Sequence, residues 1–179
     1  MPWLLSIVLG LVLLGLATFI TFPNARLAVM QGQAASSKSL GKQVPNVTLP
    51  ATMTGSINLR TLKKPVVIVF YPGDNTPGCT IQLCALRDNY KKFQEAGAEI
   101  VGVNPASVKS HQNFAERQNY PFPLISDPQN QLAEALNVSS SFGFLSRTVF
   151  VLDKEGLVRF SEPGMPSPEK LLSIVKNYN

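Results

Sequence analysis

Cysteine and histidine are scarce in this sequence, and their scarcity limits what the protein can be. The 179 residues include two cysteines, Cys79 and Cys84, and a single histidine, His111. Two cysteines cannot form the disulfide framework of a small secreted domain, and with one histidine they do not supply four ligands at zinc-finger spacing. We therefore expect no bound metal, and we expect His111 to be a surface or cap residue rather than a catalyst. Two cysteines five positions apart leave redox chemistry or coincidence as the alternatives.

A strong excess of one charge is also missing, as are the common nucleotide-binding motifs. The formal net charge is +5, and the basic residues are dispersed rather than clustered among aromatic side chains. This pattern is typical of a solvated surface and argues against a nucleic acid partner. The patterns G-x-G-x-x-G, G-x-x-x-x-G-K-[ST] and H-E-x-x-H do not occur, and no internal repeat is found. These phosphate-binding and zinc signatures are therefore excluded.

One long segment lacks charge altogether. From Trp3 to Phe22 the sequence has no charged side chain, and as a helix this run would span about 30 Å, the thickness of a bilayer's hydrocarbon core. No Lys or Arg precedes it, and it exceeds the usual signal-peptide core of about 7–15 residues. We therefore expect residues 1–23 to form a single-pass transmembrane anchor. A cleaved signal peptide is the alternative, because the triplet GQA at 32–34 resembles a small-x-small cleavage site.

Basic residues follow this apolar run and suggest its orientation. Arg26, Lys38 and Lys42 all lie on its C-terminal side, so the positive-inside rule favours a cytoplasmic location for the rest of the chain. Residues 24–42 include the polar, small-residue stretch QGQAASSKS, which is typical of a flexible tether. We expect residues 43–179 to form the folded domain.

Strand and helix signals alternate through this domain. Residues 65–71, PVVIVFY, are a continuous β-branched and aromatic run, as expected of a central strand buried on both faces. Apolar side chains recur at spacings of three and four over 79–96 and predict a helix there. The other expected strands are 47–49, 57–59, 99–103, 123–125, 147–152 and 157–160, and the other expected helices are 107–118, 129–136 and one that starts at Ser167. This order predicts an α/β domain with a central mixed sheet flanked by helices.

The most informative stretch directly follows the expected central strand. Residues 71–84 are YPGDNTPGCTIQLC, in which Thr76 suits an N-cap and Pro77 the first helical position. Cys79 would then lie in the first turn, where free backbone N–H groups and the positive end of the helix dipole favour the reactive thiolate. The alternative, a small buried hydrophobe, fits less well with a Pro-Gly helix start.

Cys84 lies farther along the same predicted helix. Five residues separate the two cysteines by about 7.5 Å along the axis and about 140° around it. A disulfide needs Cα atoms within roughly 7 Å and converging Cβ vectors, so a bridge requires the first turn or more to unwind. Reduced and oxidised states should therefore differ in local structure. An inert, buried Cys84 is the alternative.

The residues around the cysteines resemble the active-site motif of the peroxiredoxins. Pro72, Thr76 and Cys79 occupy the fixed positions of the motif Pro-x-x-x-Thr-x-x-Cys. The string YPGDNTPGCTIQLCALRDNY is similar to the peroxiredoxin Q, or bacterioferritin comigratory protein, subfamily. The similarity extends over residues 43–177 and includes SHQNFAERQNYPFPLISDP and RTVFVLDKEG. It implies a thioredoxin-like fold.

The resemblance also implies roles for single residues. Cys79 would be the peroxidatic thiol and Cys84 the resolving thiol, with Pro72, Thr76 and Arg147 lining the peroxide pocket. Arg147 is always charged and carries several donors, so it would hold the thiolate and polarise the peroxide. The Thr76 hydroxyl would hydrogen-bond the peroxide, and Pro72 would shield the thiolate from water.

The reaction implied by the resemblance is thiol-dependent reduction of hydrogen peroxide and organic hydroperoxides. Cys79 becomes a sulfenic acid, Cys84 condenses with it to an intramolecular disulfide, and thioredoxin or a similar dithiol reduces the bridge. No metal, haem or flavin takes part, and we expect a monomeric catalytic domain. Gln82 stands where many relatives carry Glu, and no step of the chemistry evidently needs that carboxylate.

Two rival functions use the same residues. A membrane-tethered thiol–disulfide oxidoreductase on this fold would be expected to carry Cys-x-x-Cys, whereas four residues separate these cysteines. A redox sensor would signal through the helix rearrangement without rapid turnover.

Overall fold

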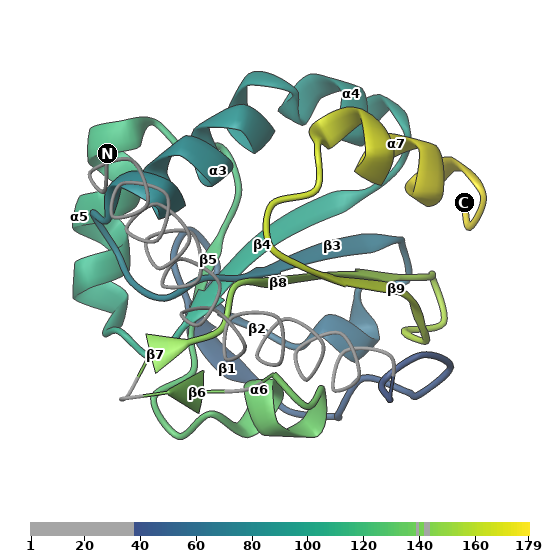
Figure 1. Ribbon diagram of the computed structural model, residues 1–179, viewed down its shortest axis with the longest axis horizontal. Coiled ribbons are helices and arrows are strands. Elements are labelled where there is room, and N and C mark those ends of the chain that lie inside the picture. Colours follow the sequence, from purple (N-terminus) through teal and green to yellow (C-terminus); the bar gives the residue numbers. More distant parts are fainter. Residues whose placement is uncertain (1–37, 139, 142–143) are drawn as a thin grey trace, which may run out of the picture. The chain divides into compact units, whose positions relative to one another are not determined.

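The computed structural model describes residues 38–138, 140–141 and 144–179, and in this part the chain forms an α/β domain around one mixed sheet (Figure 1). Its strand order is β2-β1-β5-β4-β3-β8-β9. The strands are β1 (Leu49–Ala51), β2 (Gly55–Ile57), β3 (Val66–Phe70), β4 (Glu99–Asn104), β5 (Leu124–Ser126), β8 (Thr148–Leu152) and β9 (Val158–Pro163). The helices are η1 (Leu59–Thr61), α3 (Pro77–Asp88), α4 (Tyr90–Glu95), α5 (Val108–Gln118), α6 (Gln131–Ala135) and α7 (Pro168–Lys176). A separate two-stranded ribbon pairs β6 (Ser140–Ser141) with β7 (Phe144–Leu145).

The strand directions make the sheet mixed, as the sequence predicted. The three middle strands β3, β4 and β5 run parallel, whereas β8 is antiparallel to β3, and β9 is antiparallel to β8. On the other side, β1 is antiparallel to β5 and carries β2. The predicted thioredoxin-like arrangement is confirmed.

Strand β3 divides the core into two layers. All five of its residues are buried, and alternate side chains point to opposite faces of the sheet. Val67 and Val69 pack in the layer formed with α3, α4 and α7, whereas Ile68 and Phe70 pack in the layer that includes α6. Figure 1 shows α3, α4 and α7 along one side of the strands and α6 on the other. Burial on both faces explains the unbroken apolar run in the sequence.

Several expected elements have different bounds in the structure, and for two of them a side-chain hydrogen bond explains the difference. The helix predicted over 79–96 is interrupted at Asn89, whose side chain donates to the carbonyl of Ala85 over 2.9 Å, so a polar side chain competes for the backbone of the last turn. The strand predicted over 57–59 ends at Ile57. Asn58 instead caps η1, because its side chain accepts from the backbone N–H of Arg60.

The expected fold class needs one correction, which concerns the membrane. Among residues 38–138, 140–141 and 144–179, no helix is long and apolar enough to cross a bilayer. A span needs about 20 apolar residues, whereas the longest helix in this part, α3, has 12. The run from Trp3 to Phe22 that predicted the anchor lies outside the described residues, as does Arg26. The transmembrane helix is therefore removed from the fold class, which is the thioredoxin-like α/β domain.

Contacts with the domain begin before residue 43. Ser39, near the end of the expected tether, is fully buried and donates its hydroxyl to the carbonyl of Leu136 over 2.6 Å. The backbone N–H of Gly41 donates to Val158 of β9. The boundary at residue 42 stays a prediction.

Candidate active site

Cys79 lies where the central strand passes into a helix. Strand β3 ends at Phe70, a short loop follows, and α3 starts at Pro77 with Thr76 at the N-cap position in an extended conformation. Cys79 is in the first turn of α3 and is fully buried. Backbone N–H groups of a first turn lack intrahelical acceptors and carry the positive end of the helix dipole. The local sequence therefore predicted the placement of Cys79 correctly.

Thr76 occupies the N-cap position, but its side chain does not cap the helix. Its hydroxyl instead donates back to the carbonyl of Gly73, with 3.3 Å between the two oxygens. Its backbone carbonyl accepts from Thr80 as the first helical hydrogen bond. Because the hydroxyl makes this long contact with its own loop rather than with the helix, it can rotate toward a ligand above the first turn.

Arg147 brings a positive charge to the Cys79 sulfur. Its Nη2 lies 3.3 Å from Cys79 Sγ, and the two residues are 68 positions apart in the sequence. Antiparallel pairing of β3 with β8 places Phe70 opposite Thr148, so the residue preceding β8 lies beside the loop that follows β3. A Cβ built on Gly78 would come 3.2 Å from Arg147 Nη2, so this glycine leaves room for the guanidinium. An adjacent cation favours a thiolate.

Gln82 holds the other end of the guanidinium. Arg147 Nη1 donates to Gln82 Oε1 over 2.6 Å, and Gln82 Nε2 donates to the carbonyl of Gly164 over 3.4 Å. Gln82 is buried and lies three residues after Cys79, on the same face of α3. No function was predicted for Gln82 from the sequence. Its spacing from Cys79 is the signal that could have indicated one.

Cys84 lies later in α3, in a looser environment. It is half-buried, with its Sγ 3.6 Å from Gln118 Oε1 and 3.9 Å from the Tyr120 hydroxyl. Both cysteines are free thiols within one continuous helix. That geometry holds them about 140° apart around the axis, so this is a state in which the bridge cannot form. Burial raises the pKa of Tyr120 well above its usual value, and its hydroxyl therefore remains a donor.

A buried polar cluster underlies the loop before Cys79. Asp74 accepts hydrogen bonds from four side chains: Tyr71 (2.9 Å), Asn104 (3.0 Å), Ser110 (2.5 Å) and His111 (3.0 Å). Burial raises the pKa of Asp74, but the hydrogen bonds from His111 and Ser110 outweigh that effect and lower its pKa to about 2. Burial and the nearby Asp74 raise the pKa of Tyr71 well above its usual value. The cluster therefore contains a carboxylate surrounded by donors.

Comparison with known proteins agrees with this geometry. Residues 40–161 match the AhpC/TSA family. The chain belongs to the AhpC/TSA family. It is 40% identical to the chloroplastic peroxiredoxin Q of Triticum aestivum over 159 residues, which cover 85% of this chain and 73% of that protein. The solved structure of peroxidoxin BcpB from Mycobacterium tuberculosis aligns with a TM-score of 0.72 and 31% identity, over 79% of this chain and 98% of that one.

A second solved structure, the bacterioferritin comigratory protein of Xanthomonas campestris, aligns with a TM-score of 0.68 and 31% identity, over 75% of this chain and 92% of that one. This member of the AhpC/TSA family is therefore a thiol-dependent peroxidase of the peroxiredoxin class, as its motif implied. The chain spans 62–73% of the length of the plant peroxiredoxins Q that it matches.

The predicted localisation is corrected by the same findings. The Triticum aestivum relative is named as a chloroplastic protein, and no membrane-spanning helix is present among the residues that the structure describes. The single-pass membrane location, with a cytoplasmic side favoured by Arg26, Lys38 and Lys42, is therefore not retained. The predicted contact with a membrane through Trp3 to Phe22 is not retained either.

The structure brings most of the predicted peroxiredoxin site residues together. Cys79, Thr76 and Arg147 meet at the start of α3, with Cys84 five residues farther along the helix. Pro72 is half-buried in the same loop, and its shielding of the thiolate stays a prediction. The expectation that His111 is a surface or cap residue was wrong, because the side chain is fully buried against the Asp74 carboxylate.

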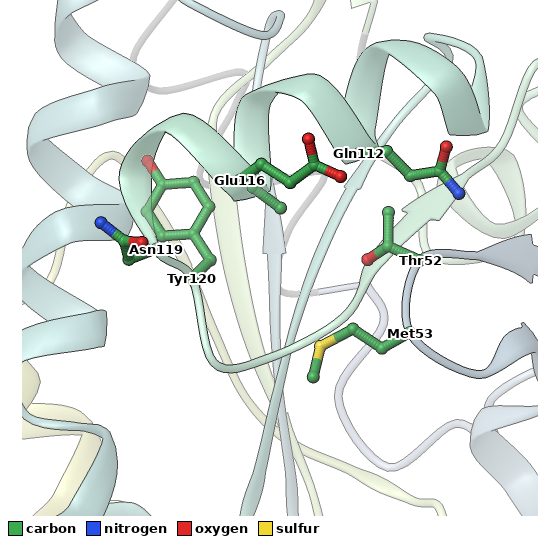
Figure 2. Close-up of a pocket in the computed structure, with 7 residues that line it drawn as sticks. Thr52, Met53, Gln112, Glu116, Asn119 and Tyr120 are labelled. Carbon is green, nitrogen blue, oxygen red and sulfur yellow. The ribbon is translucent and has the colours of Figure 1, made fainter.

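A separate hollow lies between α5 and the β1–β2 turn in this peroxiredoxin. Its volume is about 340 Å³, and Thr52 and Met53 from the β1–β2 turn face Tyr120 and the C-terminal half of α5 across it (Figure 2). Neither Cys79 nor Arg147 lines it. It therefore does not coincide with the thiol site, although Tyr120 both lines it and contacts Cys84.

Proposed function

We propose that Cys79 is the peroxidatic thiol of this peroxidase and that Cys84 resolves its oxidised form. The observation that carries this proposal is the position of Arg147, whose Nη2 lies 3.3 Å from the buried Cys79 sulfur at a helix N-terminus. A guanidinium and first-turn amides stabilise negative charge on that sulfur. A buried cysteine with no cation beside it would be an inert hydrophobe.

The first step transfers one oxygen atom from the peroxide to sulfur. The Cys79 thiolate attacks the nearer peroxide oxygen, the O–O bond breaks, and the far oxygen leaves as water or an alcohol after taking up a proton. Sulfur is oxidised to a sulfenic acid and the peroxide is reduced by two electrons. Arg147 stabilises the charge that develops on the two oxygens, a preorganised electrostatic contribution, and the Thr76 hydroxyl adds a hydrogen bond after it rotates away from Gly73. Pro72 narrows access to the sulfur from the loop side.

The second step forms the disulfide and requires motion. The Cys84 thiol attacks the Cys79 sulfenic acid, a sulfur–sulfur bond forms, and water leaves. For the sulfurs to meet, the first turns of α3 must unwind, because an intact helix holds them apart. The long contacts of Cys84 with Gln118 and Tyr120 are weak restraints on this motion.

The substrates and reductant follow from the class of enzyme. We propose that hydrogen peroxide and organic hydroperoxides are reduced, because the bacterioferritin comigratory protein of Xanthomonas campestris, a structural relative, is described as having alkyl peroxide reduction activity. A thioredoxin or similar dithiol then reduces the Cys79–Cys84 bridge by exchange, which returns two thiols. Since both cysteines belong to one helix, a single copy completes the cycle, and we propose a monomeric catalytic domain.

The test is peroxide consumption by the full chain with a thioredoxin system. We expect many equivalents of hydrogen peroxide to be consumed per protein, and the oxidised protein to contain one Cys79–Cys84 bridge by peptide mass spectrometry. Consumption of a single equivalent, with no recovery on addition of thioredoxin, would instead support a redox sensor. A bridge between two copies would refute the single-copy cycle.

A further inference from the structure

His111 is held between two hydrogen-bond acceptors. Its Nδ1 lies 3.0 Å from Asp74 Oδ2, and its Nε2 lies 3.2 Å from the carbonyl oxygen of Ile125. The ring is fully buried. A neutral imidazole has one N–H and one lone pair, so it would direct a lone pair at one of these two oxygens. Both contacts are favourable when both nitrogens carry a proton.

Asp74 supplies the balancing negative charge. Its carboxyl group is surrounded by donors from Tyr71, Asn104, Ser110 and His111, and hydrogen bonds to a carboxylate favour its ionised form. Two titratable groups from the segment after β3, Asp74 and Tyr71, lie beside the His111 ring. From β5, the carbonyl of Ile125 faces the ring. With a protonated His111, the cluster would therefore form a buried pair with no net charge.

The contact between His111 and Asp74 connects the loop before Cys79 to a helix on the same face of the sheet. Asp74 precedes the N-cap residue Thr76 by two positions, while Ser110 and His111 belong to α5. A second tie follows directly, because Arg117 of α5 donates to the side chain of Asn75. Two successive loop residues are therefore held by α5, immediately before the residues that contact the peroxide in the proposed mechanism.

We propose that His111 is a buried cation which, paired with Asp74, positions the loop that presents Thr76 and Cys79, and so acts as a positioning residue for peroxide reduction. The inference rests on the proposed function of Cys79. The pair holds the loop in its reduced conformation. Its loss slows the attack on peroxide, which needs that conformation, and does not slow disulfide formation, which abandons it.

The charge on His111 can be observed directly, because the chain contains one histidine. Protein labelled with ¹⁵N-histidine gives a single imidazole in a nitrogen–proton correlation spectrum. Because each nitrogen faces an acceptor oxygen, we expect both to carry a proton and to show the signals of an imidazolium at about pH 7. A spectrum of one neutral tautomer at about pH 7 would overturn the proposal, whether or not Cys79 reacts with peroxide.

A kinetic experiment tests the positioning role by comparing His111→Gln with the matched control Gln112→Ala. Gln112 is the exposed neighbour of His111 on α5. For folded His111→Gln we expect the second-order rate constant for Cys79 oxidation to fall about tenfold, while the conversion of sulfenic acid to disulfide keeps its rate or becomes faster. A purely structural role would lower thermal stability without separating the two steps. An oxidation rate constant within about twofold of the parent would overturn the proposal.

Two further variants cover the case in which His111→Gln fails to fold. Ser110→Ala removes one donor to Asp74 and buries no unpaired charge, and we expect a smaller fall of the same kind. Asp74→Asn combined with His111→Gln removes both charges, so it avoids an uncompensated ion. If both folded variants oxidised at the parental rate, the positioning role would be excluded. Failure of the parent to react with peroxide would refute the proposed function and leave the spectrum as the test of His111.

Discussion

The two cysteines of α3 share a helix but have opposite environments. Cys79 is fully buried, with a guanidinium nitrogen 3.3 Å from its sulfur. Cys84 is half-buried, and its nearest polar contacts are 3.6 and 3.9 Å away. The sulfur of Cys79 is thus buried beside a cation, whereas the sulfur of Cys84 makes only long polar contacts. In the proposed cycle, this difference suits Cys79 to the reaction with peroxide and lets Cys84 leave its contacts when the first turns of α3 unwind.

Cysteine replacement should separate the two roles most sharply. We expect Cys79→Ser to abolish peroxide turnover, because a serine hydroxyl is not ionised and is a poor nucleophile toward peroxide. Cys84→Ser should retain the first oxidation, since Arg147 and Thr76 are intact, and should then stop as a sulfenic acid. Trapping with a dimedone probe and mass spectrometry would measure this product. Residual turnover in Cys79→Ser would place the peroxidatic thiol elsewhere.

Substitution of Arg147 should have the next largest effect on the reaction, and it should slow only the oxidation of Cys79. Removing a preorganised group that stabilises developing charge costs about 10²- to 10³-fold in rate, and we expect Arg147→Ala to slow Cys79 oxidation by that order. Arg147→Lys should recover part of the loss, because an ammonium retains the charge but cannot contact Cys79 and Gln82 together. Rapid-quench alkylation of free thiols would give the rate constants. A slowed disulfide step with normal oxidation would contradict this assignment.

The acid stability of the domain should depend on Asp74. Its pKa is lowered from 3.8 to about 2 in the folded protein, so the stabilisation is present above about pH 4 and is lost as the pH falls toward about 2. The shift corresponds to about 2 kcal/mol. The Asp74→Asn variant should lack this contribution and show a flatter decline in the free energy of unfolding over that interval.

Urea titrations of both proteins at a series of pH values would test this expectation. The pKa of Asp153 is also lowered, by hydrogen bonds that outweigh the effect of its burial. Asp74 therefore accounts for only part of the decrease in the parent's free energy of unfolding at low pH. The quantity to compare is the difference between the curves of the two proteins. Parallel curves would show that Asp74 is not the group responsible.

How much of this site the sequence predicts depends on how far apart in the sequence the contacting residues lie. Strand β3, the position of Cys79 in a first turn, and the capping of α7 by Ser167 were predictable, because each depends on a few neighbouring residues. The contact of Arg147 with Cys79 depends on the pairing of β3 with β8. Composition and spacing do not reveal that pairing, and only the peroxiredoxin resemblance implied that Arg147 lies in the pocket.

The predictions for His111 and Gln82 missed the contacts of these side chains for the same physical reason. His111 is polar and follows a helix start, so local rules favour exposure, yet its face of α5 is buried by the Asp74 carboxylate from another part of the chain. Gln82 looked like a neutral replacement because its partners, Arg147 and Gly164, lie 65 and 82 positions away. Buried polar groups need partners, and those partners became visible in the fold.

Gln82 offers a test of how firmly Arg147 must be held. A hydrogen bond to a charged group contributes about 1.5–3 kcal/mol, so Gln82→Ala should slow Cys79 oxidation about tenfold by letting the guanidinium move. Ile81→Ala is the matched control, because Ile81 is 65% exposed one position earlier in α3. The two rate constants can be compared by stopped-flow mixing with limiting peroxide. Equal slowing in both variants would point to a general weakening of the helix.

The smallest expected effect lies on the Cys84 side. Tyr120→Phe removes a hydroxyl 3.9 Å from the Cys84 sulfur and keeps the ring that stacks on Phe122. Such a weak contact is worth about 0.5 kcal/mol, so the conversion of sulfenic acid to disulfide should become about twofold faster, with Cys79 oxidation unchanged. Quenching the reaction at successive times and counting free thiols by mass spectrometry would resolve the two steps. A slower disulfide step would mean that the hydroxyl guides Cys84 toward Cys79. The contact with Tyr120 would then assist the movement of Cys84 instead of restraining it.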